Sequence, residues 1–253
     1  DVVVSTGASE AIQSALMALV DQGDEVLIFE PWFDIYQVAV DIARGVTVGV
    51  PLRRADLRPD IEALSAAITP RTRVLLLNSP HNPAGVVFNR EELTAIAQIC
   101  IDNDIIVISD EAYEHLWYDG HPHIPIATLP GMRERTITIG SAGKSFSFTG
   151  WKVGWASGPT DLIAAVRVVR QHLSYVSSGP FQWAIAEGLA ARGHAVTLFG
   201  LAGSCAPGCV SVDSVDETER AQAFANAAPQ FDVYLDSTHR FDLSRLTDFP
   251  IVN

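Results

Sequence analysis

The sequence predicts an α/β fold in which a mainly parallel β-sheet carries helices on both faces, an α/β/α sandwich. Short, β-branched and almost continuously apolar runs alternate with amphipathic stretches over the first 190 residues. Strand–helix alternation of this kind is typical of parallel sheets. The strand-like runs show little polar alternation, as expected of strands that are buried on both faces.

The predicted elements follow one another along the chain. Strands are expected at residues 25–31, 47–52, 72–80, 105–113 and 134–142. Helices are expected at residues 9–23, 33–45, 59–69, 89–104, 161–176 and 180–190. Ser9, Asp60 and Asn89 stand at expected helix N-caps, and Gly23 and Gly45 stand at expected helix C-termini.

Composition and charge disfavour several classes of protein. The chain has 253 residues, of which 48% are hydrophobic and 19% are charged, and its net charge is −13. This composition favours a folded core over disorder. The negative charge disfavours nucleic acid and anionic membranes as partners, because both require a basic surface. We see no signal peptide and no apolar run of about 20 residues, so the expected location is the cytoplasm.

Cysteine and histidine residues predict no metal site. Cys100 lies in an apolar helical pattern and is expected to be a buried free thiol. Cys205 and Cys209 could form a bridge or bind metal, but no further ligands lie nearby. A set formed by Asp119, His121 and His123 is expected to be a solvated loop, because a fourth ligand is missing.

Polar or aromatic groups lie at the carboxyl ends of the predicted strands or directly after them. These groups are Phe33, Asn82, Asp110 with Tyr113, and Ser141 with Lys144. Ligand sites in such folds gather at the carboxyl ends of the strands. A lysine in a crevice can form a Schiff base, and a glycine-rich turn before a helix can bind phosphate. Together with a carboxylate, a phenol, an amide and an aromatic ring, these are groups that pyridoxal phosphate needs.

The sequence resembles the large domain of class I/II aminotransferases, which are fold-type-I pyridoxal-phosphate enzymes. The matching stretches are TGASEAI, EPWFDIY, NSPHNPAG, ISDEAYEHLWYDG and SAGKSFSFTGWKVGW, in order from residue 1 to about 190. YEHLWYDG and TGWKVGW are most similar to the kynurenine, glutamine and methionine aminotransferases and to the succinyldiaminopimelate aminotransferases. The resemblance implies pyridoxal 5'-phosphate as cofactor, amino-acid and 2-oxo-acid substrates, and a homodimer in full-length relatives.

The resemblance also implies roles for individual residues. Lys144 would be the Schiff-base lysine, and after the substrate displaces it, it would carry the proton between substrate and cofactor. It must lose its own proton to act, and a desolvated site beside another cation favours the neutral amine. Asp110 would keep the pyridine nitrogen protonated, while Tyr113 and Asn82 would hold the ring oxygen. Phe33 would stack on the ring, with Trp32 as the alternative.

The phosphate of the cofactor would lie at another group of residues. The resemblance assigns it to Lys152 and Ser141, with Ala8 and Ser9 as further donors, and Ser9 could serve equally as a helix cap. Many relatives carry arginine at position 152, and lysine binds phosphate without a bidentate fork. His81 is expected to be a positioning residue.

Both ends of the chain depart from the family pattern. Residues 1–190 are expected to form the pyridoxal-phosphate-binding large domain without the N-terminal segment of relatives. Residues 191–253 are expected to be a divergent tail, either a partial small domain or an aberrant sequence. The arginine that clamps the substrate carboxylate in relatives has no convincing counterpart, and Arg240 matches in composition only.

Three functions remain open at this point. The first is an aminotransferase that moves an amino group from an amino acid to a 2-oxo acid. The second is a β-lyase acting on cysteine conjugates or cystathionine with the same cofactor. The third is a non-catalytic remnant that keeps the fold. The identity of the amino acid and of the oxo acid cannot be read from the residues.

Overall fold

A computed structural model describes residues 1–175, 179–191, 193, 197–201 and 210–214. The chain divides into two compact units, Asp1–Tyr175 and Val176–Asn253. The predictions for Cys205, Cys209 and Arg240 lie outside the described residues.

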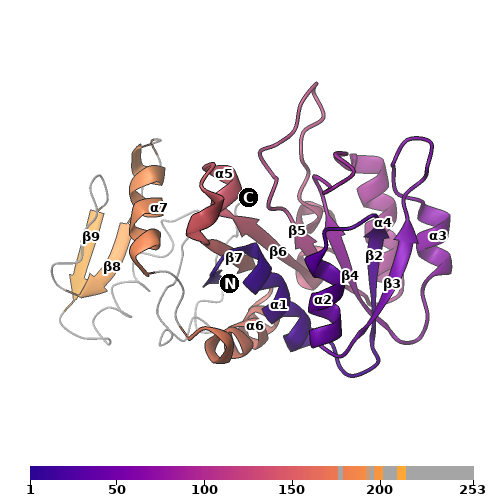
Figure 1. Ribbon diagram of the computed structural model, residues 1–253, viewed down its shortest axis with the longest axis horizontal. Coiled ribbons are helices and arrows are strands. Elements are labelled where there is room, and N and C mark those ends of the chain that lie inside the picture. Colours follow the sequence, from indigo (N-terminus) through magenta and orange to yellow (C-terminus); the bar gives the residue numbers. More distant parts are fainter. Residues whose placement is uncertain (176–178, 192, 194–196, 202–209, 215–253) are drawn as a thin grey trace. The chain divides into compact units, whose positions relative to one another are not determined.

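The first unit contains a seven-stranded sheet with the order β1-β7-β6-β5-β4-β2-β3 (Figure 1). The strands are β1 Val2–Ser5, β2 Glu25–Glu30, β3 Val46–Pro51, β4 Thr72–Asn78, β5 Ile106–Asp110, β6 Thr136–Ser141 and β7 Gly154–Ser157. Neighbours from β6 to β3 are parallel, and β7 runs antiparallel to both β6 and β1. The mainly parallel sheet that the sequence predicted is confirmed.

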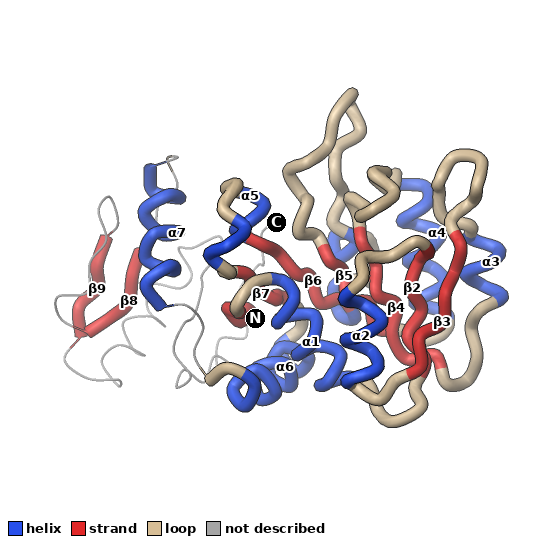
Figure 2. Tube along the Cα trace, in the orientation of Figure 1, coloured by secondary structure: helices blue, strands red, loops and turns tan. Residues whose placement is uncertain are grey.

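Helices cover both faces of this sheet (Figure 2). On one face lie α1 Ala8–Leu19, α2 Ile35–Ile42 and α6 Thr160–Leu173, and on the other lie α3 Ile61–Ala66 and α4 Arg90–Asp102. Each face has its own apolar core, because alternate residues of the buried strands point to opposite sides. Ile108 of β5 joins the core under α1, whereas Val107 joins the core under α4. The predicted α/β/α sandwich is therefore confirmed for this unit.

Short helical segments complete the first unit, and the second unit is smaller in its described part. The segments are η1 Ile126–Thr128, η2 Arg133–Arg135, α5 Ala142–Ser145 and η3 Thr149–Trp151. The second unit contains α7 Gly179–Ala191 and a parallel pair of strands, β8 Thr197–Leu201 and β9 Val210–Ser214. The predicted helix at residues 180–190 corresponds to α7.

The sequence analysis missed β1 and β7. Each strand has four residues, which is too short for a periodic pattern to separate strand from helix or turn. Both strands are defined by their pairing, since Val3 lies opposite Ala156 and Ile139 lies opposite the same residue from the other side.

Two of the three predicted N-caps are confirmed. Oδ1 of Asp60 accepts a hydrogen bond from the Ala63 amide at 2.9 Å, and Asn89 forms a capping box with Glu92. The prediction for Ser9 was wrong, because α1 begins at Ala8 and its N-cap is Gly7.

The predicted C-terminal glycines lie beyond the residues that end the helices. Helix α2 ends in a Schellman motif in which Arg44 takes the left-handed conformation at φ 67° and the Gly45 amide donates to the Val40 carbonyl at 3.0 Å. A Cβ at Gly45 would lie 2.8 Å from Cγ1 of Val20, so close packing requires this glycine. Helix α1 ends at Leu19, and Gly23 lies in the turn that precedes β2.

Cys100 is a buried free cysteine, as predicted. Burial raises the pKa of its thiol to about 12. No described helix is long and apolar enough to cross a bilayer.

Candidate functional site

A hollow of about 160 Å³ lies at the carboxyl ends of the parallel strands. The strand order reverses between β2 and β4: β3 lies on one side of β2, and β4, β5 and β6 follow on the other. Such topological switch points are where ligands bind in open α/β sheets. Strand β1 runs in the same direction as β6, because both are antiparallel to β7. The start of α1 therefore reaches the same edge of the sheet as the ends of β5 and β6.

Every residue that the sequence analysis assigned to the cofactor lines this one hollow. These residues are Ala8, Ser9, Phe33, Asn82, Asp110, Tyr113, Ser141, Lys144 and Lys152. The hollow is completed by Gly7, Ile12, Tyr36, Ala112, Gly143 and Thr149. The structure thus brings together groups from β1–α1, β2–α2 and the loops after β4, β5 and β6.

Asp110 is the last residue of β5, and protein donors hold both of its carboxylate oxygens. The hydroxyl of Tyr36 donates to Oδ2 at 2.6 Å, and the amide of Ala112 donates to Oδ1 at 3.0 Å. The Asp110 carbonyl accepts from Nδ2 of Asn78 at 2.9 Å, which ties the end of β5 to the end of β4. These contacts fix the orientation of the carboxylate toward the hollow.

Burial is the main influence on the acidity of Asp110 and Tyr36. It raises the pKa of Asp110, and the charge of Glu111 acts in the same direction, while the hydrogen bonds from Tyr36 and Ala112 and the charge of Lys144 oppose it. Burial, followed by the negative charge of Asp110, raises the pKa of Tyr36 well above its usual value. Tyr36 therefore keeps its proton and remains a donor to Asp110.

Tyr36 is the polar, Asp110-contacting residue that the sequence analysis missed. It lies in the first turn of α2, three residues after Phe33, which precedes the helix, and the two rings meet edge to face with centroids 5.7 Å apart. The available signal was the predicted helix over residues 33–45, in which aromatic residues three apart fall on one face. Of the two aromatic residues considered for ring stacking, Phe33 lines the hollow and Trp32 does not.

Lys144 lies in the short helix α5, directly after β6. Its Nζ lies 5.2 Å from the centroid of the Tyr113 ring, within the range of a cation–π contact. The preceding residue, Gly143, packs closely against the backbone of Thr149, because a Cβ at position 143 would lie 2.9 Å from the Cα of Thr149. This close approach of residues 143 and 149 sets the turn in which Lys144 lies.

The start of α1 forms another side of the hollow. No side chain caps this helix, and its N-cap Gly7 has φ 80°. Lys152 takes the left-handed conformation at φ 52°, and a Cβ on Gly7 would lie 3.6 Å from its Cδ. Free backbone N–H groups at a helix N-terminus beside a lysine form a site for a phosphate group.

The loop after β4 is held by buried polar contacts. The amide of Asn82 donates to Oδ1 of Asn78 at 2.7 Å. His81 is buried and stacks on Phe88 at 6.0 Å, and its Nδ1 accepts from the Ala84 amide at 3.4 Å. Burial lowers the pKa of His81 from 6.5 to about 4. His81 does not line the hollow, and its contacts agree with the positioning role that we expected.

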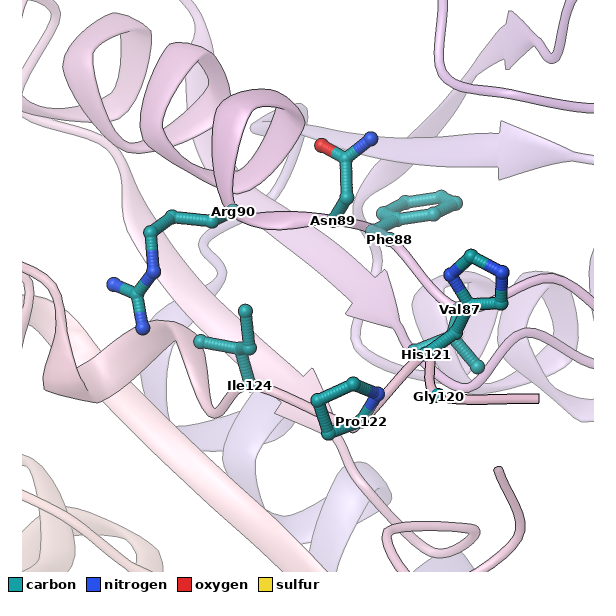
Figure 3. Close-up of a pocket in the computed structure, with 8 residues that line it drawn as sticks. All are labelled: Val87, Phe88, Asn89, Arg90, Gly120, His121, Pro122 and Ile124. Carbon is teal, nitrogen blue, oxygen red and sulfur yellow. The ribbon is translucent and has the colours of Figure 1, made fainter. Parts of the chain in front are cut away.

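The predicted solvated loop with Asp119, His121 and His123 is correct only in part. Asp119 and His121 are exposed, and His121 borders a separate hollow between the start of α4 and residues 120–124 (Figure 3). The side chain of His123, in contrast, is only 6% exposed and contacts Glu111. No cluster of metal ligands occurs among the residues that the structure describes.

A family model described as "Aminotransferase class I and II" matches residues 1–196. The chain belongs to this family. The match covers the whole hollow and extends through α7, so the aminotransferase resemblance drawn from the motifs is confirmed.

Several aminotransferases resemble the chain in sequence. A probable N-succinyldiaminopimelate aminotransferase of Mycobacterium tuberculosis is 51% identical over 191 residues, which cover 75% of this chain and 48% of that protein. Kynurenine–oxoglutarate transaminase 3 of Mus musculus is 45% identical over 197 residues, which cover 74% of this chain and 43% of that protein. The chain spans about half the length of these curated aminotransferases.

Solved aminotransferase structures share the fold. The N-succinyldiaminopimelate aminotransferase of M. tuberculosis superposes with a TM-score of 0.74 at 50% identity, covering 76% of this chain and 50% of that one. YbdL of Escherichia coli, whose structure is described as identifying a methionine aminotransferase function, superposes with a TM-score of 0.74 at 37% identity. That match covers 76% of this chain and 51% of YbdL.

Proposed function

We propose that residues 1–190 provide the pyridoxal-phosphate-binding large domain of an aminotransferase, which transfers an amino group from an amino acid to a 2-oxo acid. The observation that carries this proposal is that Asp110 and Lys144 line a single hollow at the switch point of the sheet. A carboxylate and a lysine amine on one small cavity can contact opposite ends of one flat cofactor. Residues 191–253 remain, in this proposal, a divergent tail.

The donor set of the hollow fits pyridoxal 5'-phosphate. Lys152, Ser141 and the first turn of α1, with Ala8 and Ser9, would hold the phosphate. Asp110 would face the ring nitrogen, Asn82 and Tyr113 would hold the phenolic oxygen, and Phe33 would stack on the ring. When bound, this cofactor supplies an electron sink for the electrons left on the substrate as its α-proton departs.

Two residues of this chain would handle protons. The amine of Lys144 would bind the cofactor aldehyde and, once released by the substrate amine, would accept the substrate α-proton. Asp110 would keep the ring nitrogen protonated, because a negative carboxylate at short range favours the positively charged ring. Tyr36 supports that role, since its hydroxyl orients the carboxylate and stabilises its negative charge.

Substrates and partners belong to the proposal as well. Relatives act on kynurenine, N-succinyldiaminopimelate or methionine according to their names, so the hollow is proposed to accept an amino acid and a 2-oxo acid. A homodimer is proposed by analogy with the family. The cytoplasm is the proposed location.

The two lysines of the chain make a direct test possible, since residues 144 and 152 are the only lysines in the sequence. Protein incubated with pyridoxal phosphate is reduced with borohydride, and the modified lysine is identified by peptide mass spectrometry. We expect modification of Lys144 alone and loss of the yellow absorbance in Lys144→Ala. Modification of Lys152 instead, or equal cofactor binding by Lys144→Ala, contradicts the proposal.

A second measurement separates aminotransferase from β-lyase and from a non-catalytic scaffold. The loaded protein is mixed with single amino acids, and the change in cofactor absorbance is followed without an oxo acid. Conversion of the cofactor to its amine form supports amino transfer. Pyruvate release from a cysteine conjugate without an acceptor supports the lyase, and no spectral change with any amino acid supports the scaffold.

A further inference from the structure

A buried histidine–glutamate contact lies behind the proposed cofactor site. Nε2 of His123 lies 2.8 Å from Oε2 of Glu111, and the two side chains are only 6% and 2% exposed. The other oxygen of Glu111 accepts a hydrogen bond from the Ser109 hydroxyl at 2.8 Å. None of these three residues lines the hollow.

The pair lies on the opposite side of β5 from Asp110. Ser109 and Asp110 point to opposite faces of the strand, because side chains alternate, and Glu111, which follows the strand, lies on the Ser109 side because it accepts the Ser109 hydroxyl. Asp110 contacts Tyr36 of α2 on its face, whereas Val107, two residues before Ser109, belongs to the core under α4. The end of β5 is thus held from both sides.

Glu111 depends on His123 for a polar partner. A buried carboxylate is unfavourable unless it is paired and hydrogen-bonded. His123 supplies a ring nitrogen at hydrogen-bond distance, and its own Nδ1 has no hydrogen-bond partner within the described part of the chain. The contact with Glu111 therefore determines the position of the imidazole.

The contact also closes a loop. Glu111 and His123 are twelve residues apart, and the chain between them rises from the edge of the sheet after β5 (Figure 1). Residues 115–122 are exposed, among them Trp117 at 42% and Tyr118 at 72%. Tyr113, which faces Lys144, lies at the start of this excursion.

We propose that the Glu111–His123 pair is a clasp that positions Asp110 and Tyr113. It closes the loop of residues 112–122 onto the end of β5 and so fixes the two site residues that flank Glu111. The clasp rests on the proposed function only where it concerns the cofactor, and both residues are positioning residues that do not contact the cofactor.

Substitutions at position 123 test the clasp. His123→Gln places a side-chain amide nitrogen at about the position that Nε2 of His123 occupies, so it can still donate to Glu111. His123→Leu removes the polar group and leaves Glu111 without this partner. His121→Leu is the matched control, because His121 is exposed and lies two residues earlier in the same loop. All variants are made in the full 253-residue chain.

Two readouts are measured well below the melting temperature. The first is hydrogen exchange of the amides of residues 112–121 without cofactor, where the Glu114 and Leu116 amides donate to the carbonyls of Glu111 and Tyr113. The second is the Kd for pyridoxal phosphate from an absorbance titration. For His123→Leu we expect faster exchange in this segment and about a tenfold higher Kd, the low end of the effect that residues supporting metal ligands have on metal binding. His123→Gln should recover both values, and His121→Leu should leave both unchanged.

The outcomes separate the clasp from the proposed function. Unchanged exchange and Kd in His123→Leu, or no recovery by His123→Gln, would overturn the clasp. If wild-type protein binds no pyridoxal phosphate, the proposed function fails, and the exchange data still decide whether the loop is closed. If His123→Leu does not fold, His123→Asn replaces it, because asparagine keeps a polar group that is too short to reach Glu111.

Discussion

Tyr36 and Asp110 lie 74 residues apart in the sequence, and the phenol of Tyr36 donates a 2.6 Å hydrogen bond to the buried carboxylate of Asp110. The contact joins α2 to the end of β5, and both residues line the hollow. It leaves the carboxylate oriented toward the space that Lys144 also faces.

Replacing Asp110 by asparagine should change stability and cofactor binding in opposite directions. Burial raises the pKa of Asp110 above its unfolded value, so the folded state binds this proton more tightly and loses stability as the pH rises through that interval. Asp110→Asn removes this cost at neutral pH and should raise the melting temperature of cofactor-free protein. It should weaken pyridoxal phosphate binding about 30-fold, or about 2 kcal/mol, the scale of a hydrogen bond to a charged group.

The measurements for Asp110→Asn are thermal unfolding at pH 5 to 8 and an absorbance titration with the cofactor. Asp119→Asn is the control, since Asp119 is exposed. Cofactor affinity equal to that of the wild type would argue against a role for Asp110 at the ring nitrogen.

Removing the hydroxyl of Tyr36 should weaken the site without disrupting the fold. Tyr36→Phe keeps the ring against Phe33 but leaves Oδ2 of Asp110 without its donor. We expect cofactor affinity to fall about tenfold and unfolding free energy to fall by about 1–3 kcal/mol. Titration and urea unfolding check both values. Tyr118→Phe, at a residue that is 72% exposed, should match the wild type.

Gly154 should tolerate no side chain. A Cβ there would lie 2.7 Å from the carbonyl carbon of Gly7 and 2.8 Å from the amide nitrogen of Ala8, both backbone atoms at the start of α1. Gly154→Ala should destabilise the protein by about 1–3 kcal/mol and weaken pyridoxal phosphate binding, because it displaces the proposed phosphate site. Gly150→Ala meets no atom within 4 Å and is the control. Equal urea midpoints for the two variants would contradict this prediction.

His81 should make the protein less stable as the pH falls below about 6.5. Its pKa is lowered from 6.5 to about 4 by burial, so between these values the unfolded chain binds a proton that the folded chain does not. The loss of unfolding free energy from this group should approach about 3 kcal/mol at pH 4. Urea unfolding of wild type and His81→Gln at pH 4.5 and pH 7 isolates the effect. A variant with the same pH dependence as the wild type would assign the acid sensitivity to other groups.

Much of the fold and of the candidate site could be predicted because the relevant signals are local. The apolar runs that became β2, β4 and β5 are continuous in the sequence, and the polar residues that follow them reach one edge of the sheet because parallel strands end together. Asn89 and Asp60 cap their helices through bonds that span three residues. Such short-range chemistry is readable without coordinates.

Tertiary structure alone decided the contacts between distant segments. The sequence by itself determined which residue types reach the hollow, including Lys144 and Asp110. It did not determine that Tyr36 holds Asp110, that His123 is buried against Glu111, or that residues 2–5 pair with residues 154–157. The physical reason is that periodicity and capping act within a few residues, whereas these contacts arise only when packing of the sheet and its helices brings separate parts of the chain together.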